Sequence, residues 1–389
     1  MIRVLFLIPD LGHGGAERVL VNLVNHLDRE RFDVTVMTLF DQGVNKKYLN
    51  EDVRYKSASI KQFRGYSRII AYTPATWLYR WIVKEPYDIV VSYLEGACSK
   101  IISGCPYPET KKVAWIHIEL DSARRLSAGF RGRLDAVKAY ARFDKIICVA
   151  DTVKQTFLKT AREDFPQVQV LYNTNETDTI RRKALEIVDD VVFSSDTINV
   201  CSVAKLMHSK GYDRLIRVHK RLLEEGLRHH IYILGVGEEE SKLKHFAEHN
   251  DLTDTFTLLG FRDNPYPYVK AADVYICSSR REGFSTAITE SLIVGTPVVT
   301  TCCSGAYELL GEKDPALTQE ENGKYELCTC GIVTENSEQG IYEGLKRMLQ
   351  DASLRELYAK RAYERGQCFS TEQTVSAVEK MLVELYEEN

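Results

Sequence analysis

Long apolar runs are missing from this sequence of 389 residues. No window of roughly 18 consecutive apolar residues occurs, so we predict no membrane-spanning helix. The first apolar run, 4–8, ends at Pro9 and Asp10 and is too short for a secretory signal. Proline and glycine, with ten and 23 residues, are too few for a collagen, a mucin-like stalk or a linker-dominated chain.

Paired cysteine motifs are absent as well. The chain has ten cysteines, but none forms a Cys-x-x-Cys pair, and several lie inside apolar runs such as IICVA and VYICSS. This pattern predicts reduced thiols in a cytoplasmic protein, without a disulfide framework. The spacing of Cys302, Cys303, Cys328 and Cys330 matches no familiar zinc site, so we do not expect these cysteines to hold a metal, and nothing else in the sequence leads us to expect a cofactor.

What is present is an ordinary globular composition with an uneven charge. Hydrophobic residues make up 44% of the chain and charged residues 27%, and the net charge is −4. Residues 1–175 carry 26 Lys and Arg against 19 Asp and Glu, whereas the remainder carries 25 against 36. A basic half and an acidic half indicate two domains with different partners. We do not expect nucleic acid to be one of them, since the basic half contains no recognisable nucleic-acid-binding motif.

Strand-like and helix-like patterns alternate through both halves. Apolar runs of strand length occur at 4–8, 32–39, 87–94, 111–118, 144–151 and 167–173, then at 197–206, 230–237, 255–260, 272–279 and 297–301. Apolar residues at helical spacing follow the first run, from Ala16 to Leu27. Such alternation predicts an α/β protein of two Rossmann-like, doubly wound parallel-sheet domains that face each other across a cleft. We expect the first domain at 1–178, a polar linker at 179–196, the second domain at 197–368, and a C-terminal helix at 369–389 that packs back on the first domain.

A glycine-rich turn joins the first strand to the first helix. It contains Gly12, Gly14 and Gly15, and Glu17 follows it. Glycine lets backbone amides approach a ligand closely, and a helix N-terminus favours anionic oxygens. A tight turn without a ligand remains the alternative interpretation.

A second motif places two carboxylates seven residues apart. Glu282 follows the run at 272–279, and Glu290 lies inside a helix that Ser285 or Thr286 can cap and Gly295 can end. Open α/β sheets bind ligands at the carboxyl ends of their strands, where Glu282 would lie. The pair suits a nucleotide sugar, with one carboxylate on sugar hydroxyls and the other on the ribose. The alternative is a loop charge and an exposed helix residue.

Two lysines and one histidine also follow strand-like runs. Lys205 and Lys210 come after the first run of the second half, where two cations can converge on a diphosphate. His117 ends the run at 111–118. The alternatives are a solvated lysine pair and a core histidine.

Together these segments resemble the retaining glycosyltransferases of family 4, which have the GT-B fold. EGFSTAITESLIVGTPVVTT resembles their Glu-x7-Glu signature, and GGAERVLVNLVNHL, YNTN, AKLMHSKGYDRLI and ILGVGEEE are similar to their other landmarks, in the same order. The resemblance covers essentially the whole chain. Relatives with the GGAER opening resemble enzymes of bacterial capsule, exopolysaccharide or lipopolysaccharide assembly.

The resemblance implies a role for each motif residue. Catalytic roles fall on Glu282, His117 and Lys210, and donor-binding roles fall on Gly14, Gly15, Lys205, Lys210, Phe261, Gly283, Phe284, Ser285 and Glu290. Glu282 would hold hydroxyls of the donor sugar, Glu290 the ribose, and the backbone of Phe261 the base. Family members commonly have Arg at position 205, so the lysine there is a departure that changes the detail of the phosphate contact.

The expected reaction is transfer of a sugar, with retention, from a nucleotide sugar to a glycan or lipid-linked acceptor. UDP is the favoured nucleotide, and no metal is expected. The alternatives are a nucleotide-sugar epimerase of the same fold and a non-catalytic sugar-nucleotide-binding protein.

A basic, aromatic stretch at 56–84 offers a further partner. It contains Lys56, Lys61, Phe63, Arg64, Arg68, Trp77, Arg80, Trp81 and Lys84. One interpretation is an anionic membrane surface at the inner face of the cell membrane, which would make the cytoplasmic protein peripheral. The other is a helix packed on its own domain with a solvated basic face.

Overall fold

The computed structural model describes residues 1–12, 14–60, 65–303, 305–317 and 323–388. The chain divides into two compact units, unit 1 with residues 1–175 and 371–389, and unit 2 with residues 176–370. Three residues singled out from the sequence, Lys61, Phe63 and Arg64, lie outside the described residues, as does His13 in the glycine-rich turn.

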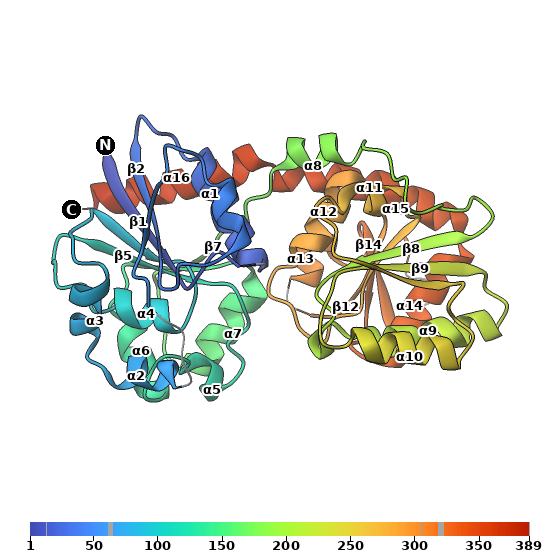
Figure 1. The fold of residues 1–389 in the computed structure, drawn as a ribbon, viewed down its shortest axis with the longest axis horizontal. Helices are drawn as coiled ribbons and strands as arrows, with labels where there is room; N and C mark the ends of the chain where they lie inside the picture. Colours follow the sequence, from blue (N-terminus) through green and yellow to red (C-terminus); the bar gives the residue numbers. More distant parts are fainter. Residues whose placement is uncertain (13, 61–64, 304, 318–322, 389) are drawn as a thin grey trace. The chain divides into compact units, whose positions relative to one another are not determined.

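Unit 1 is a parallel sheet covered by helices on both faces (Figure 1). Its strands are β1 (Ile2–Ile8), β2 (Phe32–Thr38), β3 (Arg54–Ser57), β4 (Ile89–Ser92), β5 (Lys111–Ile116), β6 (Lys145–Cys148) and β7 (Val168–Val170). Its helices are α1 (Gly15–His26), the 3-10 turn η1 (Val44–Tyr48), α2 (Tyr66–Tyr72), α3 (Ala75–Ile82), α4 (Ala97–Ile102), α5 (Ala123–Leu126), α6 (Arg133–Tyr140), α7 (Asp151–Ala161) and α16 (Thr371–Glu387). The strand order is β3-β2-β1-β4-β5-β6-β7, so the order reverses between β1 and β4.

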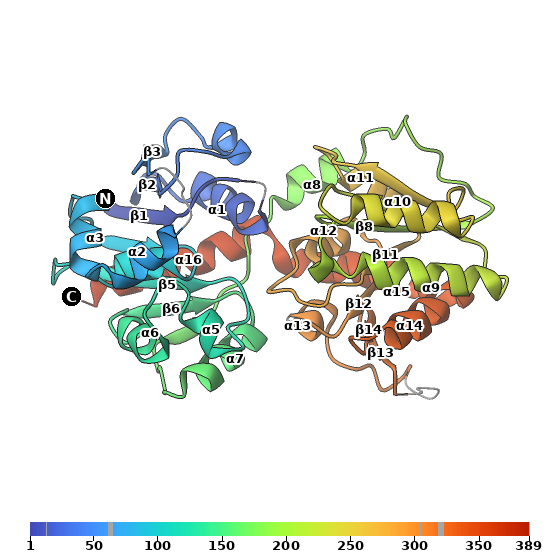
Figure 2. The same cartoon turned by 60° about the horizontal axis from the view of Figure 1, so that its bottom comes forward.

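The apolar runs of the sequence form the centre of this sheet. Val4 to Ile8 of β1 are fully buried, as expected for a strand covered on both faces. Helix α1 packs against α16 on one face, and α2, α3, α4 and α6 form a layer on the other (Figures 1 and 2). The last helix returns to this unit, where Glu379 accepts a hydrogen bond of 2.7 Å from the backbone of Asp28.

Unit 2 repeats the architecture. Its strands are β8 (Ile198–Val203), β9 (His229–Leu234), β10 (Phe256–Gly260), β11 (Val274–Cys277), β12 (Val298–Thr301), β13 (Tyr325–Cys328) and β14 (Gly331–Thr334). Its helices are α8 (Thr177–Lys183), η2 (His208–Lys210), α9 (Tyr212–Glu224), α10 (Glu240–His249), α11 (Tyr266–Ala271), α12 (Thr286–Val294), α13 (Ala306–Leu310), α14 (Glu338–Gln350), α15 (Ala352–Gly366) and η3 (Gln367–Phe369). The order β10-β9-β8-β11-β12-β14-β13 reverses between β8 and β11.

The second sheet departs from the expected parallel arrangement at one edge. Strand β13 runs antiparallel to β14, with Tyr325 opposite Thr334 and Cys328 opposite Gly331. Only Thr329 and Cys330 separate the two strands, and so short a connection can join only antiparallel neighbours. The sheet of unit 2 is therefore parallel except at this edge.

The segment expected as a linker is partly structured. Helix α8 covers its first residues and packs against α11 and α12, and the whole of 179–196 lies in unit 2. Asn264 ties the end of this helix to the loop after β10, because its amide donates to the carbonyl of Lys183 at 3.0 Å.

Candidate functional site

The reversal of strand order in unit 2 gathers two of the predicted motifs. Lys205 and Lys210 follow β8, and Glu282 follows β11, the two strands between which the order reverses. Ligands of open α/β sheets bind outside the carboxyl ends of the strands at such a reversal. The topology therefore brings together residues that lie more than 70 positions apart in the sequence.

Lys210 and Glu282 are in direct contact. The Lys210 ammonium lies 2.6 Å from Oε1 of Glu282, and the Ser279 hydroxyl donates to the same oxygen at 2.6 Å. The Cys277 thiol is a third, weaker donor to Oε1, at 4.0 Å. Each of these three contacts falls on Oε1, so Oε2 is the carboxylate oxygen suited to accept a hydrogen bond from a ligand.

Burial strengthens this ion pair. The side chains of Lys210 and Glu282 are 24% and 14% exposed. Burial alone lowers the pKa of the Lys210 ammonium, but the charge and hydrogen bond of Glu282 outweigh it, and the net pKa is raised. Burial, together with the Glu282 charge, raises the pKa of the Cys277 thiol. Lys210 is therefore a firmly charged cation at neutral pH, beside a neutral thiol.

Two arginines fix the loop that carries Glu282. The buried Arg214 guanidinium donates to the carbonyl of Ser278 at 2.7 Å. Arg280 forms a two-pronged ion pair with Asp213, at 2.6 and 2.8 Å, and this pair lowers the pKa of the Asp213 carboxyl to about 2. The start of α9 is thereby attached to the loop after β11 by bidentate contacts, which hold the loop in a defined position.

Gly211 is required where the lysine segment meets this loop. It has φ +72°, and a Cβ at this position would lie 2.1 Å from the carbonyl oxygen of Ser278. A side chain would therefore both strain the backbone and push the two loops apart.

Helix α12 begins directly after the Glu282 loop. Ser285 is its N-cap, and its hydroxyl accepts from the amide of Ile288 at 3.4 Å, while Gly295 ends the helix with φ +81°. Phe284 is buried, with its ring 5.8 Å from that of Phe369. The backbone from Gly283 to Ser285 thus leads into a capped helix N-terminus, which favours anionic groups.

The second carboxylate of the motif belongs to a different contact. Glu290 lies on α12, and the Tyr266 hydroxyl donates to its Oε1 at 3.3 Å. Tyr266 begins α11, a few residues beyond Phe261, whose side chain is 55% exposed in the loop after β10. Glu290 is thus tied to the loop predicted to meet the base, and Glu282 to the loop predicted to meet the phosphates.

Lys205 is exposed after β8, and its ammonium forms no ion pair within the described ranges. The structure brings Lys210 to Glu282 but leaves the side chain of Lys205 in solvent. The convergence of Lys205 and Lys210 on a diphosphate therefore stays a prediction.

In unit 1 the glycine-rich turn is also held in place. The amide of Gly12 donates to the Asp10 carboxylate at 2.8 Å, and Asn45 donates to the carbonyl of Gly12. Gly14 is the N-cap of α1, and a Cβ there would lie 1.8 Å from the Glu17 carboxylate. Gly15 is the first residue of the helix. This turn follows β1, one of the two strands at which the order of this sheet reverses.

His117 lies at the end of β5 and is 7% exposed. Its ring is 4.8 Å from that of Tyr93 and 6.3 Å from that of Trp115. Burial lowers the pKa of His117 to about 3, against the opposing effect of a backbone hydrogen bond to Tyr93. Its Nε2 has no hydrogen-bond partner among the described residues. The imidazole is therefore neutral at pH 7, with a buried Nε2 that has no partner in the part of the chain that the structure describes.

The structure adds two residues that sequence reasoning missed. Ser279 is one, through its bond to Glu282. Glu95, just after β4, is the other: its Oε2 accepts from the backbone amide of His117 at 3.1 Å, and burial raises its pKa. The sequence could have pointed to both residues only through their position, because each follows the carboxyl end of a strand next to the reversal of strand order.

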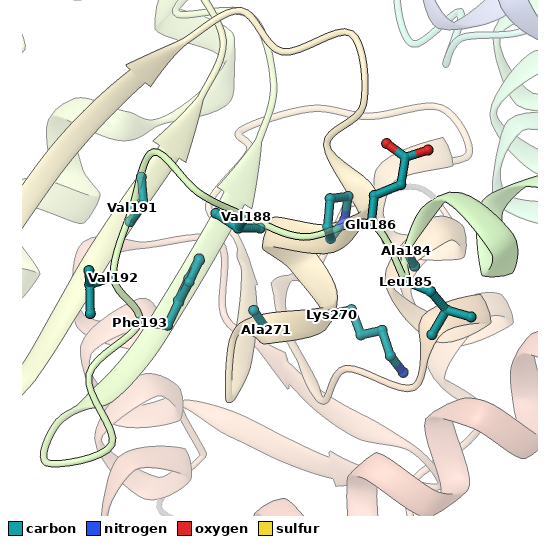
Figure 3. A pocket seen from close by; sticks show the side chains of 10 residues that line it. Ala184, Leu185, Glu186, Val188, Val191, Val192, Phe193, Lys270 and Ala271 are labelled. Atoms are coloured by element: carbon teal, nitrogen blue, oxygen red, sulfur yellow. The ribbon is translucent and has the colours of Figure 1, made fainter.

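A cavity of about 630 Å³ lies elsewhere in unit 2 (Figure 3). It is lined by the chain after α8, including Leu185 and Phe193, and by Lys270 and Ala271 of α11. It shares no lining residue with the predicted site. Within the ranges that the structure covers, no group of three or more His, Cys, Asp and Glu is arranged to hold a metal, and no helix is both long and apolar enough to cross a membrane. All ten cysteines are described, and all are free thiols.

Two family models match the chain. The model described as Glycosyltransferase Family 4 matches residues 13–178, and the model described as Glycosyl transferases group 1 matches residues 185–365. An uncharacterized glycosyltransferase of Haemophilus influenzae is 24% identical over 330 residues, which cover 84% of this chain and 88% of the relative. The N-acetylgalactosamine-N,N'-diacetylbacillosaminyl-diphospho-undecaprenol 4-alpha-N-acetylgalactosaminyltransferase of Campylobacter jejuni is 33% identical over 202 residues, or 52% of this chain and 49% of the relative.

The fold is also similar to solved structures. Anabaena Alr3699/HepE, crystallised with UDP and glucose, superposes with a TM-score of 0.74 at 18% identity, over 98% of this chain and 100% of that one. The expected fold class, two Rossmann-like α/β domains of the GT-B type, is confirmed.

Proposed function

Since this chain belongs to the glycosyltransferases through both of its halves, we propose that it transfers a sugar, with retention, from a nucleotide sugar to an acceptor hydroxyl. The contact between Lys210 and Glu282 at the reversal of strand order in unit 2 carries the proposal. This pair supplies the Lys210 ammonium, which is charged at neutral pH, for a departing diphosphate. It also supplies the Glu282 carboxylate, whose Oε2 can accept hydrogen bonds from sugar hydroxyls.

On the donor side, each residue has a role that its position supports. Lys210 would neutralise the diphosphate as it leaves, with the N-terminus of α12 as a second source of positive potential. Oε2 of Glu282 would accept from sugar hydroxyls, and Glu290 with Tyr266 would hold the ribose. Exposed Lys205 would add charge at the diphosphate once a donor is bound.

Unit 1 would hold the acceptor and would also contribute to donor binding. The backbone of Gly14 and Gly15 would face anionic oxygens at the start of α1. The neutral ring of His117 would bind a hydroxyl of the reacting sugar through Nε2, which no described residue occupies.

The proposed chemistry needs no nucleophile from the protein. The acceptor oxygen would attack the anomeric carbon on the face that the leaving group departs from. The bond between that carbon and the donor phosphate oxygen would break, its electron pair would stay on the diphosphate, and the acceptor proton would pass to a donor phosphate oxygen. Lys210 and the α12 N-terminus would stabilise the charge that develops. Analysis of the product by NMR tests the stereochemistry: inversion at the anomeric carbon would exclude this route.

We propose a UDP-linked donor and a lipid-linked glycan acceptor of a bacterial surface polysaccharide. The GGAER opening supports the pathway, and the Campylobacter relative, whose name contains a diphospho-undecaprenol acceptor, supports the lipid. The complex of HepE with UDP makes UDP-glucose the first donor to test. Such an enzyme would act in the cytoplasm, at the inner face of the cell membrane.

A nucleotide-release assay separates this function from its alternatives. The protein is incubated with a panel of UDP- and GDP-sugars, with and without a membrane extract as acceptor source. A transferase releases nucleotide that depends on the extract, and labelled sugar enters the lipid fraction. Altered sugar without added extract indicates an epimerase, and binding without turnover indicates a non-catalytic protein.

Glu282→Ala tests the site itself. We expect loss of at least about a thousandfold in transfer, since the sugar contact and the partner of Lys210 both disappear. Glu356→Ala, on an exposed face of α15 in the same unit, is the control and should retain full activity. Wild-type turnover by a folded Glu282→Ala protein would remove Glu282 from the mechanism.

A further inference from the structure

Helices α2 and α3 of unit 1 present large apolar side chains to solvent. Ile69, Tyr72, Trp77 and Trp81 are 54%, 67%, 72% and 62% exposed. The opposite sides of the same helices are buried, and both helices pack against α4. Large aromatic residues are seldom this exposed, because each forfeits the hydrophobic gain of burial. Three exposed aromatic residues and one exposed isoleucine within 13 residues form a patch that favours a partner.

The charge on this patch has one sign. No Asp or Glu occurs in 53–84, and the side chains of Arg68, Arg80 and Lys84 are exposed. Arg131 joins from another segment, with its guanidinium 5.8 Å from the centre of the Tyr72 ring. These four cations, with Ile69, Tyr72, Trp77 and Trp81, are named here the α2–α3 surface.

The acidic residues that border the α2–α3 surface are already paired. Glu85, the next acid along the chain, lies 2.5 Å from Lys56 and 3.7 Å from Arg3. Asp135, near Arg131, lies 2.9 Å from Lys100. Asp135 also accepts a hydrogen bond from the Arg131 amide at 3.2 Å, so it offsets part of the charge of Arg131. Neither carboxylate forms an ion pair with Arg68, Arg80 or Lys84 among the described residues, so the surface favours an anionic partner.

We propose that the α2–α3 surface docks this protein onto a lipid bilayer that contains anionic lipids. Trp and Tyr rings favour the headgroup level of a bilayer, where their apolar body and polar edge are both accommodated. Exposed Arg and Lys side chains are attracted to anionic headgroups in the same plane. The helices have only seven and eight residues, so they lie on the bilayer without crossing it.

Vesicle flotation with the full chain tests the docking. The vesicles are phosphatidylcholine alone, or phosphatidylcholine with about 30% phosphatidylglycerol, at about 0.05 M and 0.5 M salt. We expect at least about tenfold tighter binding to the anionic vesicles at low salt, and much weaker binding at high salt. Absence of binding at low salt, or equal binding to both vesicles, would overturn the proposal and leave a protein partner as the occupant.

Paired variants locate the contact. Trp77→Ala/Trp81→Ala should weaken binding to anionic vesicles at least about tenfold. Ile187→Ala/Val192→Ala removes side chains that are 90% and 85% exposed in unit 2 and should leave binding unchanged. If both double variants bind like the wild type, the α2–α3 surface is not the docking site.

Charge is tested in the same way. Arg68→Gln/Arg80→Gln should weaken binding by about fivefold per charge. Lys138→Gln/Lys159→Gln, on exposed positions of α6 and α7, is the matched control. Equal losses in both pairs would point to non-specific attraction and contradict a defined surface.

Membrane docking does not depend on the proposed sugar transfer. The two tryptophans touch none of the predicted donor residues, so Trp77→Ala/Trp81→Ala should retain donor-induced thermal stabilisation. Failure of vesicle binding would leave the proposed transferase standing, and failure of transfer would leave the docking surface standing.

Discussion

Glu95 and His117 lie at the ends of neighbouring strands, and burial disfavours the charged form of each. The hydrogen bond between them joins the Glu95 carboxylate to the backbone of His117, not to its ring. Glu95 therefore fixes where the His117 backbone lies, while the ring keeps Nε2 for another partner. A carboxylate that positions a histidine in this way is visible only in three dimensions, because 22 residues separate the two.

This contact makes Glu95→Gln and Glu95→Ala unequal. The amide of Gln keeps an oxygen for the His117 N–H and removes a charge that burial penalises, so at pH 8 this variant should be at least as stable as the wild type. Glu95→Ala leaves a buried N–H unpaired and should lose about 1–3 kcal/mol. Urea unfolding followed by tryptophan fluorescence measures both. Equal destabilisation by the two substitutions would show that the hydrogen bond to His117 is not what Glu95 contributes.

Gly211 is a second single residue on which the geometry of the candidate site depends. Gly211→Ala would bring a methyl group against the Ser278 carbonyl and strain the backbone beside Lys210, and we expect a loss of about 1–3 kcal/mol. Gly226 also has a positive φ, +83°, but open space around its Cβ. Gly226→Ala is therefore the control for backbone strain alone. Thermal unfolding with and without UDP should show that only Gly211→Ala also loses stabilisation by the nucleotide.

At the scale of elements, the N-terminus of helix α12 combines two roles. Ser285 caps it, and we propose that it also stabilises the diphosphate of the donor. Ser285→Ala removes its N-cap and should cost about 1 kcal/mol, or about 2–4 °C in Tm for a domain of this size. Ser337 caps α14 in the same manner, accepting from the amide of Gly340 at 3.0 Å. Ser337→Ala should lose similar stability but bind UDP-sugar normally, whereas Ser285→Ala should also bind it more weakly. Identical donor affinity in the two variants would limit Ser285 to capping.

The elements that could be predicted from the sequence are those with a strong apolar pattern. All the apolar runs that we interpreted as strands contain strands, because continuous burial in a parallel sheet leaves a clear signal. Strand β3, with sequence RYKS, was missed because an edge strand needs few apolar residues. Strands β13 and β14 were missed because each has only four residues, and their antiparallel pairing depends on a two-residue turn.

The sequence could predict which residues lie at the site, but not which of them are in direct contact. Strand-end position correctly selected Lys210 and Glu282 for the same edge of the sheet. Their direct ion pair, and the role of Ser279 beneath it, depend on rotamers and loop paths that no spacing encodes. The exposure of Lys205 likewise follows from the local course of the chain after β8.

At the scale of the whole molecule, buried neutral histidines in unit 2 predict sensitivity to acid. Burial lowers the pKa of His219 to about 2 and that of His230 to about 4, while an unfolded histidine titrates near 6.5. Below pH 6.5 the unfolded chain therefore binds more protons than the folded one, and the free energy of unfolding falls as the pH falls. We expect a loss of up to about 1.4 kcal/mol per pH unit for each such histidine between pH 6.5 and about 4.

The positions of the tryptophans allow the acid sensitivity of unit 2 to be measured separately from the unfolding of unit 1. All three tryptophans, Trp77, Trp81 and Trp115, lie in unit 1, so fluorescence follows unit 1 and circular dichroism follows both. A urea transition seen by circular dichroism alone reports unit 2, and it should shift to lower urea between pH 7 and pH 5. His230→Gln should reduce the shift. A transition that stays constant over this range would contradict neutral burial of these histidines.

Helix α16 gives unit 1 a discontinuous chain: its first 175 residues and its last 19 are separated by the whole of unit 2. During synthesis, unit 2 has all of its residues before unit 1 does. The surface of α1 that packs against α16 therefore stays uncovered until residues 371–388 have been synthesised, and a nascent chain halted before residue 371 would expose apolar surface that chaperones recognise.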